Sequence, residues 1–193
     1  MAAPPISVIE AAILAACKSP CQKSKRGAVV FHPFGGYVGI PAFNSRPDMK
    51  CDPVCQPTKS DLIIERATRQ GSPTACARMC LHAEQRAIRF ALVASHRSQF
   101  IADGDFSFPL EDCELVHVKV VDGNLVPSGG PSCILCAKEI ADVPLHGVWL
   151  YESMEPVEGF ASAPSFVPAK GGVWNFYPTK QFWERTLKEC GLT

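Results

Sequence analysis

His82-Ala83-Glu84 and the more distant Cys133-Ile134-Leu135-Cys136 are the two stretches from which this sequence is best interpreted. One imidazole and two thiolates make three protein ligands for zinc, which leaves the fourth tetrahedral position open for water, as in catalytic zinc sites. Glu84, two residues beyond the histidine, would exchange protons with that water. Each motif alone is weak evidence, because ten cysteines and five histidines produce such pairs by chance. Together and in this order, they predict a catalytic zinc site on His82, Cys133 and Cys136.

The segment 81–94 has the pattern of a helix with one broad apolar face. That face carries Ala83, Ala87, Ile88, Phe90, Ala91, Leu92 and Ala94. Glu84 falls inside it, where a carboxylate is costly unless it is paired or functional. An ion pair inside the fold would also explain this position, but the neighbouring candidate zinc ligand favours a catalytic role for Glu84. The alanines predict close packing against a sheet.

The second half of the site also opens a predicted helix, from Cys133 to Ala141. Residues three apart lie on one face of a helix, so Cys133 and Cys136 point the same way. The positive end of the helix favours thiolates at its first turn. A redox pair is the alternative interpretation of Cys-x-x-Cys, and the upstream histidine and glutamate make it the weaker one.

Length and composition predict one domain spanning residues 1–193, with an inserted Cys-rich segment at 46–80 and a C-terminal loop, strand and helix at 152–193. Nineteen basic and nineteen acidic residues give no net charge, which weakly disfavours a dedicated nucleic-acid binder. The apolar run near the N-terminus is too short to span a bilayer and has no preceding basic residues. We therefore expect a cytoplasmic protein without membrane partners, whose cysteines are metal ligands and buried thiols rather than disulfides.

The remaining periodicities predict further helices and strands. Helices are expected from Pro5 to Cys17 and from Thr179 to about Cys190; strands are expected at 27–31, 37–40, 115–121, 147–151 and 171–177. The first helix would bury the face formed by Ile6, Ile9, Ile13 and Ala16. His117 lies in the central strand and is interpreted as an ordinary strand residue rather than a ligand. The direction of the last strand is not determined by the sequence.

Two polar features near the first strands leave alternatives open. The basic residues Lys18, Lys23, Lys25 and Arg26 could contact a phosphate or form a solvated turn, and short charge runs favour the turn. Asn44 follows the second strand, where a carboxamide could bind a sugar hydroxyl or a base edge. From spacing alone, a turn-forming role for Asn44 is the better supported of the two.

The segment 46–80 contains two Cys-x-x-x-Cys pairs within a stretch rich in proline and polar residues. Four cysteines at Cys51, Cys55, Cys76 and Cys80 would suit a second, structural zinc that staples a loop without its own core. Buried free thiols are the alternative, because Cys17 and Cys21 repeat the same spacing where no metal is needed.

The sequence resembles the cytidine deaminase superfamily over about residues 5–152. The resemblance is carried by Ser19-Pro20-Cys21 to Gly27-Ala28-Val29-Val30, by His82 to Ile88 and by Pro131-Ser132-Cys133-Ile134-Leu135-Cys136, and is greatest to the deoxycytidylate and tRNA adenosine deaminase branch. It implies a three-layer α/β/α fold around a mixed five-stranded sheet. It also implies that Asn44 contacts the substrate sugar and that the amide of Ala83 binds the pyrimidine carbonyl. Ser132, between the usual proline and the first cysteine, departs from the family pattern.

These observations predict a zinc-dependent deaminase that converts a cytosine-type base to uracil in a free nucleoside or nucleotide. Deamination of cytosine or adenine in single-stranded DNA or RNA is the alternative, with Arg66, Arg69, Arg86, Arg89 and Arg97 along a groove. A purine or pterin substrate stays open as well. A non-catalytic, zinc-stapled binding module is the alternative from a different class. A homo-oligomer is compatible with all of these.

Overall fold

The structure is a computed structural model that describes residues 3–21, 24–34, 36–45, 81–98, 108–128, 133–153, 172–189 and 191–192. In chain order the elements are α1 (Ile6–Cys17), β1 (Lys25–His32), β2 (Gly36–Tyr37), β3 (Ala42–Phe43), α4 (Ala83–Ser98), the 3₁₀ helix η2 (Leu110–Asp112), β4 (Glu114–Val121), β5 (Asn124–Val126), α5 (Ile134–Ala141), β6 (Gly147–Ser153), β7 (Gly172–Pro178) and α6 (Thr179–Glu189). The predicted four-cysteine zinc site at Cys51, Cys55, Cys76 and Cys80 lies outside the described residues.

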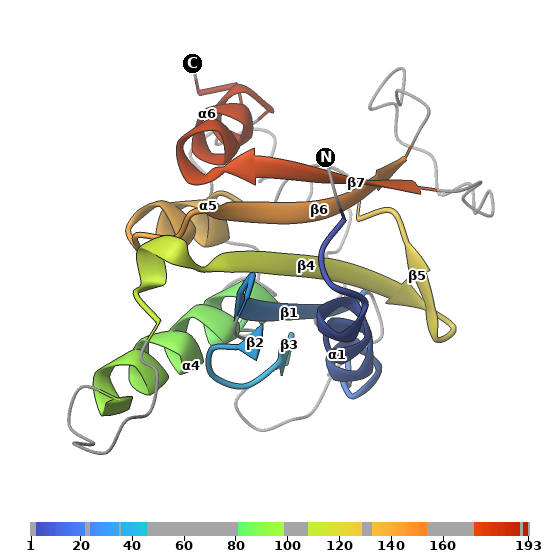
Figure 1. The fold of residues 1–193 in the computed structure, drawn as a ribbon. Coiled ribbons are helices and arrows are strands. Elements are labelled where there is room, and N and C mark those ends of the chain that lie inside the picture. The colour runs from blue at the N-terminus through green and yellow to red at the C-terminus, as the bar shows by residue number, and fades with distance from the viewer. Residues whose placement is uncertain are drawn as a thin grey trace.

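One mixed sheet joins all the described strands, in the order β2-β1-β4-β6-β7, with the short β3 on β1 and β5 on β4 (Figure 1). The pair β4 and β6 is parallel, whereas the other pairs are antiparallel. The mixed sheet implied by the resemblance is therefore confirmed, with two short strands added to the five of the main path. The last strand, β7, runs antiparallel to β6.

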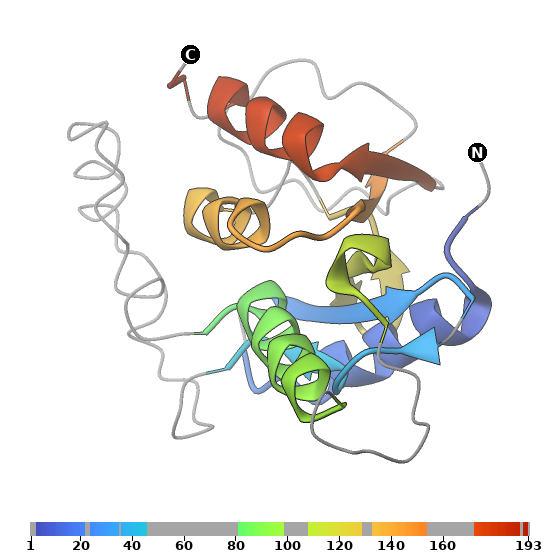
Figure 2. The ribbon, with the colours of Figure 1, turned by 60° about the vertical axis from the view of Figure 1, so that its left-hand side comes forward.

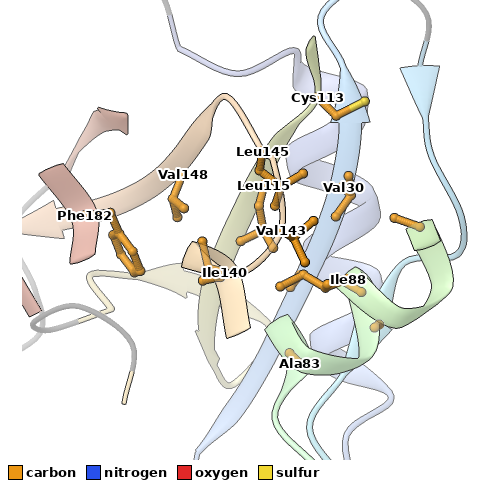
Figure 3. Close-up of a cluster of buried hydrophobic side chains, with 14 of the residues drawn as sticks. Val30, Ala83, Ile88, Cys113, Leu115, Ile140, Val143, Leu145, Val148 and Phe182 are labelled. Atoms are coloured by element: carbon orange, nitrogen blue, oxygen red, sulfur yellow. The ribbon is translucent and has the colours of Figure 1, made fainter. Parts of the chain in front are cut away.

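Helices cover both faces of the sheet, which confirms the three-layer α/β/α class. On one face, α4, α5 and α6 pack on Ala28, Val30, Leu115, Val148 and Leu150; on the other, α1 packs on Val29, Phe31, Val116, Val118 and Val120 (Figures 1 and 2). The first of these two cores gathers Ile88 from α4, Ile140 from α5 and Phe182 from α6 around the sheet (Figure 3). Alternation along β4 places Leu115 and His117 on the α4 side.

The predicted apolar face of α1 is correct at Ala16 but wrong at Ile6. Val8, Ala12, Ala15 and Ala16 are the buried residues, whereas Ile6 is 75% exposed. The reason lies in β1, where a Cβ at Gly27 would sit 2.0 Å from the carbonyl oxygen of Ala12. Because the helix backbone touches the strand so closely, only the small-residue face fits against it.

The predicted return strand at 37–40 is present but shorter, because β2 covers only Gly36–Tyr37. The chain pairs with β1 twice, first through β2 and then through β3, and the break between them contains Gly39 with a φ of +85°. A Cβ at Gly39 would lie 2.7 Å from the carbonyl carbon of Phe90 in α4. Gly39 is therefore required both by its backbone conformation and by the close approach of α4.

A tight turn follows β4 and closes a hairpin. Asp122 and Gly123 both have positive φ, 49° and 80°, as expected for a two-residue hairpin turn, and they join β4 to β5. β5 has only three residues, too few for the sequence pattern to reveal it. Within the described part of the chain, no helix is long and apolar enough to cross a bilayer.

Candidate metal centre and its carboxylate

His82 is fixed at the start of α4 by bonds on both sides. Its carbonyl accepts the first helical hydrogen bond, from Arg86, and its N–H donates to the Gln85 side chain at 3.3 Å. This is half of a capping box, in which the third helical residue satisfies the N–H of the capping residue. The preceding residue, Leu81, forms an isolated β-bridge with Ser45. The imidazole is thus placed by the helix start and by the edge of the sheet.

The two cysteines lie at the start of α5, which is tied directly to α4. Cys133 is the N-cap residue and its carbonyl accepts from the N–H of Ala137, so the predicted helix begins one residue later than expected. Glu139 of α5 accepts hydrogen bonds from Gln85 Nε2 at 2.9 Å and from Arg89 Nε at 3.1 Å, both on α4. This link sets the distance between the two helices that carry the predicted ligands.

The structure brings the three predicted ligands together. Nδ1 of His82 lies 3.1 Å from Sγ of Cys136 and 3.3 Å from Sγ of Cys133, and the two sulfurs are 3.3 Å apart. Zn–S bonds of about 2.3 Å and Zn–N bonds of about 2.0 Å in a tetrahedron require edges of roughly 3.5–3.8 Å. The triangle would open by only about half an ångström around the ion. The donor set and its spacing therefore fit zinc.

Electrostatics around the sulfurs also suit a cation. The pKa of Cys133 is lowered to about 5, chiefly because its sulfur shares a hydrogen bond with that of Cys136 and because His82 lies beside it. The pKa of Cys136 is raised by that same hydrogen bond, by burial and by the nearby negative charge of Glu84. Without metal, the pair holds one thiolate and one thiol. A bound cation would displace the remaining proton, because zinc ligates thiolates.

Glu84 is buried, as its position on the apolar face of the helix predicted. The residue is 3% exposed, and its Oε1 lies 3.5 Å from Nε2 of His117 on β4. His117 is itself 1% exposed, and burial lowers its pKa to about 4 in spite of the neighbouring carboxylate. The imidazole is consequently neutral at neutral pH and can offer Glu84 a hydrogen bond but no full charge.

Comparison with known proteins adds structural neighbours. No protein-family model and no curated protein matches the sequence. The dCMP deaminase of the cyanophage S-TIM5 in its apo form is similar over 74% of this chain and 77% of that one, with 22% identity and a TM-score of 0.39. The structure titled as its complex with dCMP and dUMP is similar over 74% and 76%, with 21% identity and a TM-score of 0.38. Both neighbours are dCMP deaminases.

The predicted substrate residues lie at the edge of this centre. Asn44 is buried, and its Oδ1 accepts from the N–H of Arg26 at 2.8 Å and from Ser19 Oγ at 2.9 Å, while its Nδ2 donates to the Ser24 carbonyl. These bonds join the start of β1 to the end of β3, and a sugar contact by Asn44 stays a prediction. Ala83 opens α4, where the first N–H groups have no partner within the helix.

Two residues at the centre were missed as part of the site. His117 was interpreted as an ordinary strand residue, and Arg26 as part of a basic turn. The Arg26 side chain instead reaches inward: its Nη1 lies 3.4 Å from His117 Nε2, and its Nη2 donates to the carbonyl of Ser128 at 3.4 Å. The available signal was a polar residue, His117, between Val116 and Val118 in the predicted central strand.

Proposed function

We propose that this chain is a zinc-dependent hydrolytic deaminase that converts a cytosine-type base to uracil in a free nucleoside or nucleotide. One observation carries the proposal: the ligand atoms of His82, Cys133 and Cys136 all lie within 4.8 Å of one another beside a buried carboxylate. That carboxylate, Glu84, is close enough for its charge to raise the pKa of Cys136. Three ligands and an adjacent acid-base group are what hydrolysis at zinc needs.

The roles of the residues follow from this arrangement. When bound, zinc would supply the nucleophile by acidifying a water molecule. Glu84 takes the proton of that water and passes it to the ring nitrogen next to the amine-bearing carbon, while oxygen adds to that carbon. Glu84 then takes the second proton, from the hydroxyl group newly attached to the carbon, and gives it to the amine as the bond between carbon and nitrogen breaks. The sum consumes one water and releases one ammonia, with the amine replaced by a carbonyl.

The state of the arginines favours a small substrate over a nucleic-acid strand. Among those proposed for a groove, Arg86 bonds Ser45 and stacks on the ring of Phe43, 5.0 Å from its centroid. Arg89 is engaged with Glu139. Arginines that are already bonded within the protein are less available to phosphates. Arg66, Arg69 and the side chain of Arg97 lie outside the described part of the structure.

A non-catalytic zinc module explains the site less well. A purely structural site would close the metal with a fourth protein ligand and would have no use for a buried carboxylate at its side. The described cluster contains three ligands, and Glu84 is 3% exposed. The second zinc on Cys51, Cys55, Cys76 and Cys80 stays a separate proposal, to be tested by zinc stoichiometry.

Ammonia release tests the activity. The zinc-loaded protein is screened against cytosine, cytidine, deoxycytidine, their monophosphates, adenosine and guanine compounds, and single-stranded oligonucleotides. We expect release from a free cytosine nucleoside or nucleotide. Activity confined to oligonucleotides, with a steep salt dependence, would support the alternative substrate class.

Two carboxylate variants test the assignment of Glu84. Glu84→Ala should keep its zinc and lose turnover by about 10²- to 10⁴-fold, the usual contribution of an acid-base group. Glu114→Gln is the matched control, because Glu114 is also buried in the sheet but bonds Trp149 and His146 on the other face of β4. Substantial deamination by Glu84→Ala would refute the assignment.

A further inference from the structure

His117 occupies a position that the proposed chemistry leaves unexplained. It projects from β4 toward α4, is fully buried, and is not one of the three metal ligands. Its Nε2 is 3.5 Å from the carboxylate of Glu84 and 3.4 Å from Nη1 of Arg26. One ring nitrogen thus faces both an acceptor and a donor. A buried histidine kept for packing alone would more simply be an apolar residue.

A neutral imidazole can satisfy only one of these two neighbours through Nε2. If Nε2 carries the proton, it donates to Glu84; if it does not, it can accept from Arg26, and its lone pair then faces the carboxylate oxygen. Arg26 has other acceptors, Ser24 Oγ at 3.1 Å and the Ser128 carbonyl, and is only half-buried. The carboxylate is buried and gains more from a donor. The balance therefore places the proton on Nε2.

The other ring nitrogen supports the same conclusion. Nδ1 of His117 is buried and has no hydrogen-bond partner among the described residues. An unpaired lone pair at Nδ1 accompanies an Nε2–H that is used by Glu84. The opposite tautomer would leave an N–H unpaired and would also set a lone pair against the carboxylate. Such an unsatisfied group in a buried position is typical of a residue retained for function.

We infer that His117 is a positioning residue that donates its Nε2–H to Glu84 and holds the carboxylate in the orientation that proton transfer requires. Arg26 completes the arrangement, because its bond to the Ser128 carbonyl gives the guanidinium an acceptor other than Nε2. This inference rests on the proposed deaminase function. The distance of 3.5 Å should shorten when substrate closes the site, as catalytic hydrogen bonds often do.

Steady-state kinetics of zinc-loaded variants test the inference. His117→Leu removes the donor and should lower kcat about 10- to 100-fold, the usual cost of losing a supporting hydrogen bond, with KM and zinc content nearly unchanged. His117→Gln can place an amide N–H near the same point and should recover most of kcat. His146→Leu is the matched control, since His146 bonds the buried Glu114 in a similar way on the other face of β4. An unchanged kcat in folded His117→Leu, or equal losses in the leucine and glutamine variants, overturns the inference.

A second measurement does not depend on turnover or on any variant folding. The ¹⁵N spectrum of the imidazoles in the zinc-loaded wild-type protein, assigned by correlation to the His117 backbone, shows which ring nitrogen carries the proton. We expect the proton on Nε2, and a proton on Nδ1 overturns the inference. If the wild-type protein deaminates none of the compounds screened, the proposed function fails, while the position of this proton is still decided.

Discussion

Lowering the pH should destabilise this protein through His117 in a way that can be calculated. The residue is fully buried and its pKa is lowered from 6.5 to about 4, mainly because burial disfavours the imidazolium. In the unfolded chain the imidazole regains a pKa of about 6.5. Between these two values the unfolded state binds more protons than the folded one. Stability from this group is therefore complete above pH 6.5 and is lost as the pH falls toward 4.

The size of the effect follows from the shift. A difference of about 2.5 pKa units corresponds to about 3 kcal/mol of unfolding free energy, of which about 2 kcal/mol should be lost by pH 5. That is a large share of the stability of an ordinary domain, typically about 5–15 kcal/mol. The carboxylates and the zinc ligands also titrate, so the wild-type slope alone cannot be assigned to His117.

Comparing the wild type with His117→Gln separates the contribution of His117 to stability from the contributions of the other titrating groups. Urea unfolding is followed by tryptophan fluorescence from about pH 7.5 to about pH 5, for the wild type and for His117→Gln, with the same zinc and reductant. The glutamine does not titrate, so the free energy of the variant should fall about 2 kcal/mol less than that of the wild type over this range. Parallel pH profiles for the two proteins would refute the reasoning. They would mean that the imidazole is not buried and neutral in the folded protein.

Three further predictions test the frame of the site. Gly39→Ala should lower the free energy of unfolding in urea by about 3 kcal/mol or more, because Gly39 has a positive φ and the new Cβ would lie 2.7 Å from the α4 backbone. Gly123→Ala, whose new Cβ would enter open space, should lower it by only about 1 kcal/mol. Glu139→Ala should weaken zinc binding about 10-fold in a chelator competition by releasing α4 from α5, while Asp142→Ala, which removes only an exposed pair with Lys138, should not. Removing zinc with a chelator should abolish deamination and leave the far-UV circular dichroism of the sheet and helices in place; loss of the secondary structure would contradict this.

The ligand set could be predicted because its information is local. His82 and Glu84 lie in one helical turn, and Cys133 and Cys136 in another, so the chemistry of each half can be read from a few neighbouring residues. The burial of Glu84 followed from helical periodicity in the same way. Assembling the two halves required the resemblance to a known family, since nothing in the spacing brings α4 beside α5.

The errors arose where packing depends on residues far apart in the sequence. Ile6 was expected to be buried because it is apolar and lies at helical spacing, but the contact between α1 and β1 is set by Gly27, which admits only a small-residue face. Periodicity describes one element at a time and contains no information about how closely its partner approaches. The return strand is shorter than predicted for the same reason, because Gly39 packs against the backbone of α4.

The contact between His117 and Arg26 depends on the register between β1 and β4, and strand register is even harder to predict from the sequence. β1 and β4 pair so that Ala28 lies opposite His117, and Arg26, two residues earlier in β1, faces the same side of the sheet and reaches the imidazole. A slip of one residue would turn His117 to the α1 face, away from Glu84. The polar contacts of the site thus depend on the strand pairing that the apolar core enforces. This dependence explains why the ligands could be predicted and their supporting residues could not.

The predicted ligands are positioned by hydrogen bonds within the protein that do not require a metal ion. His82 is fixed by Gln85 and by the bridge at Leu81, while Glu139 joins the two helices by direct hydrogen bonds. A structural zinc site supplies folding free energy because its ligands are otherwise unrestrained. Here the protein has already brought the three ligand atoms together, so under the proposed function the ion would add chemistry rather than architecture. Under the proposed function, the same preorganisation would extend to Glu84 through His117, a buried neutral imidazole that lowers stability in acid and would orient the carboxylate used in the reaction.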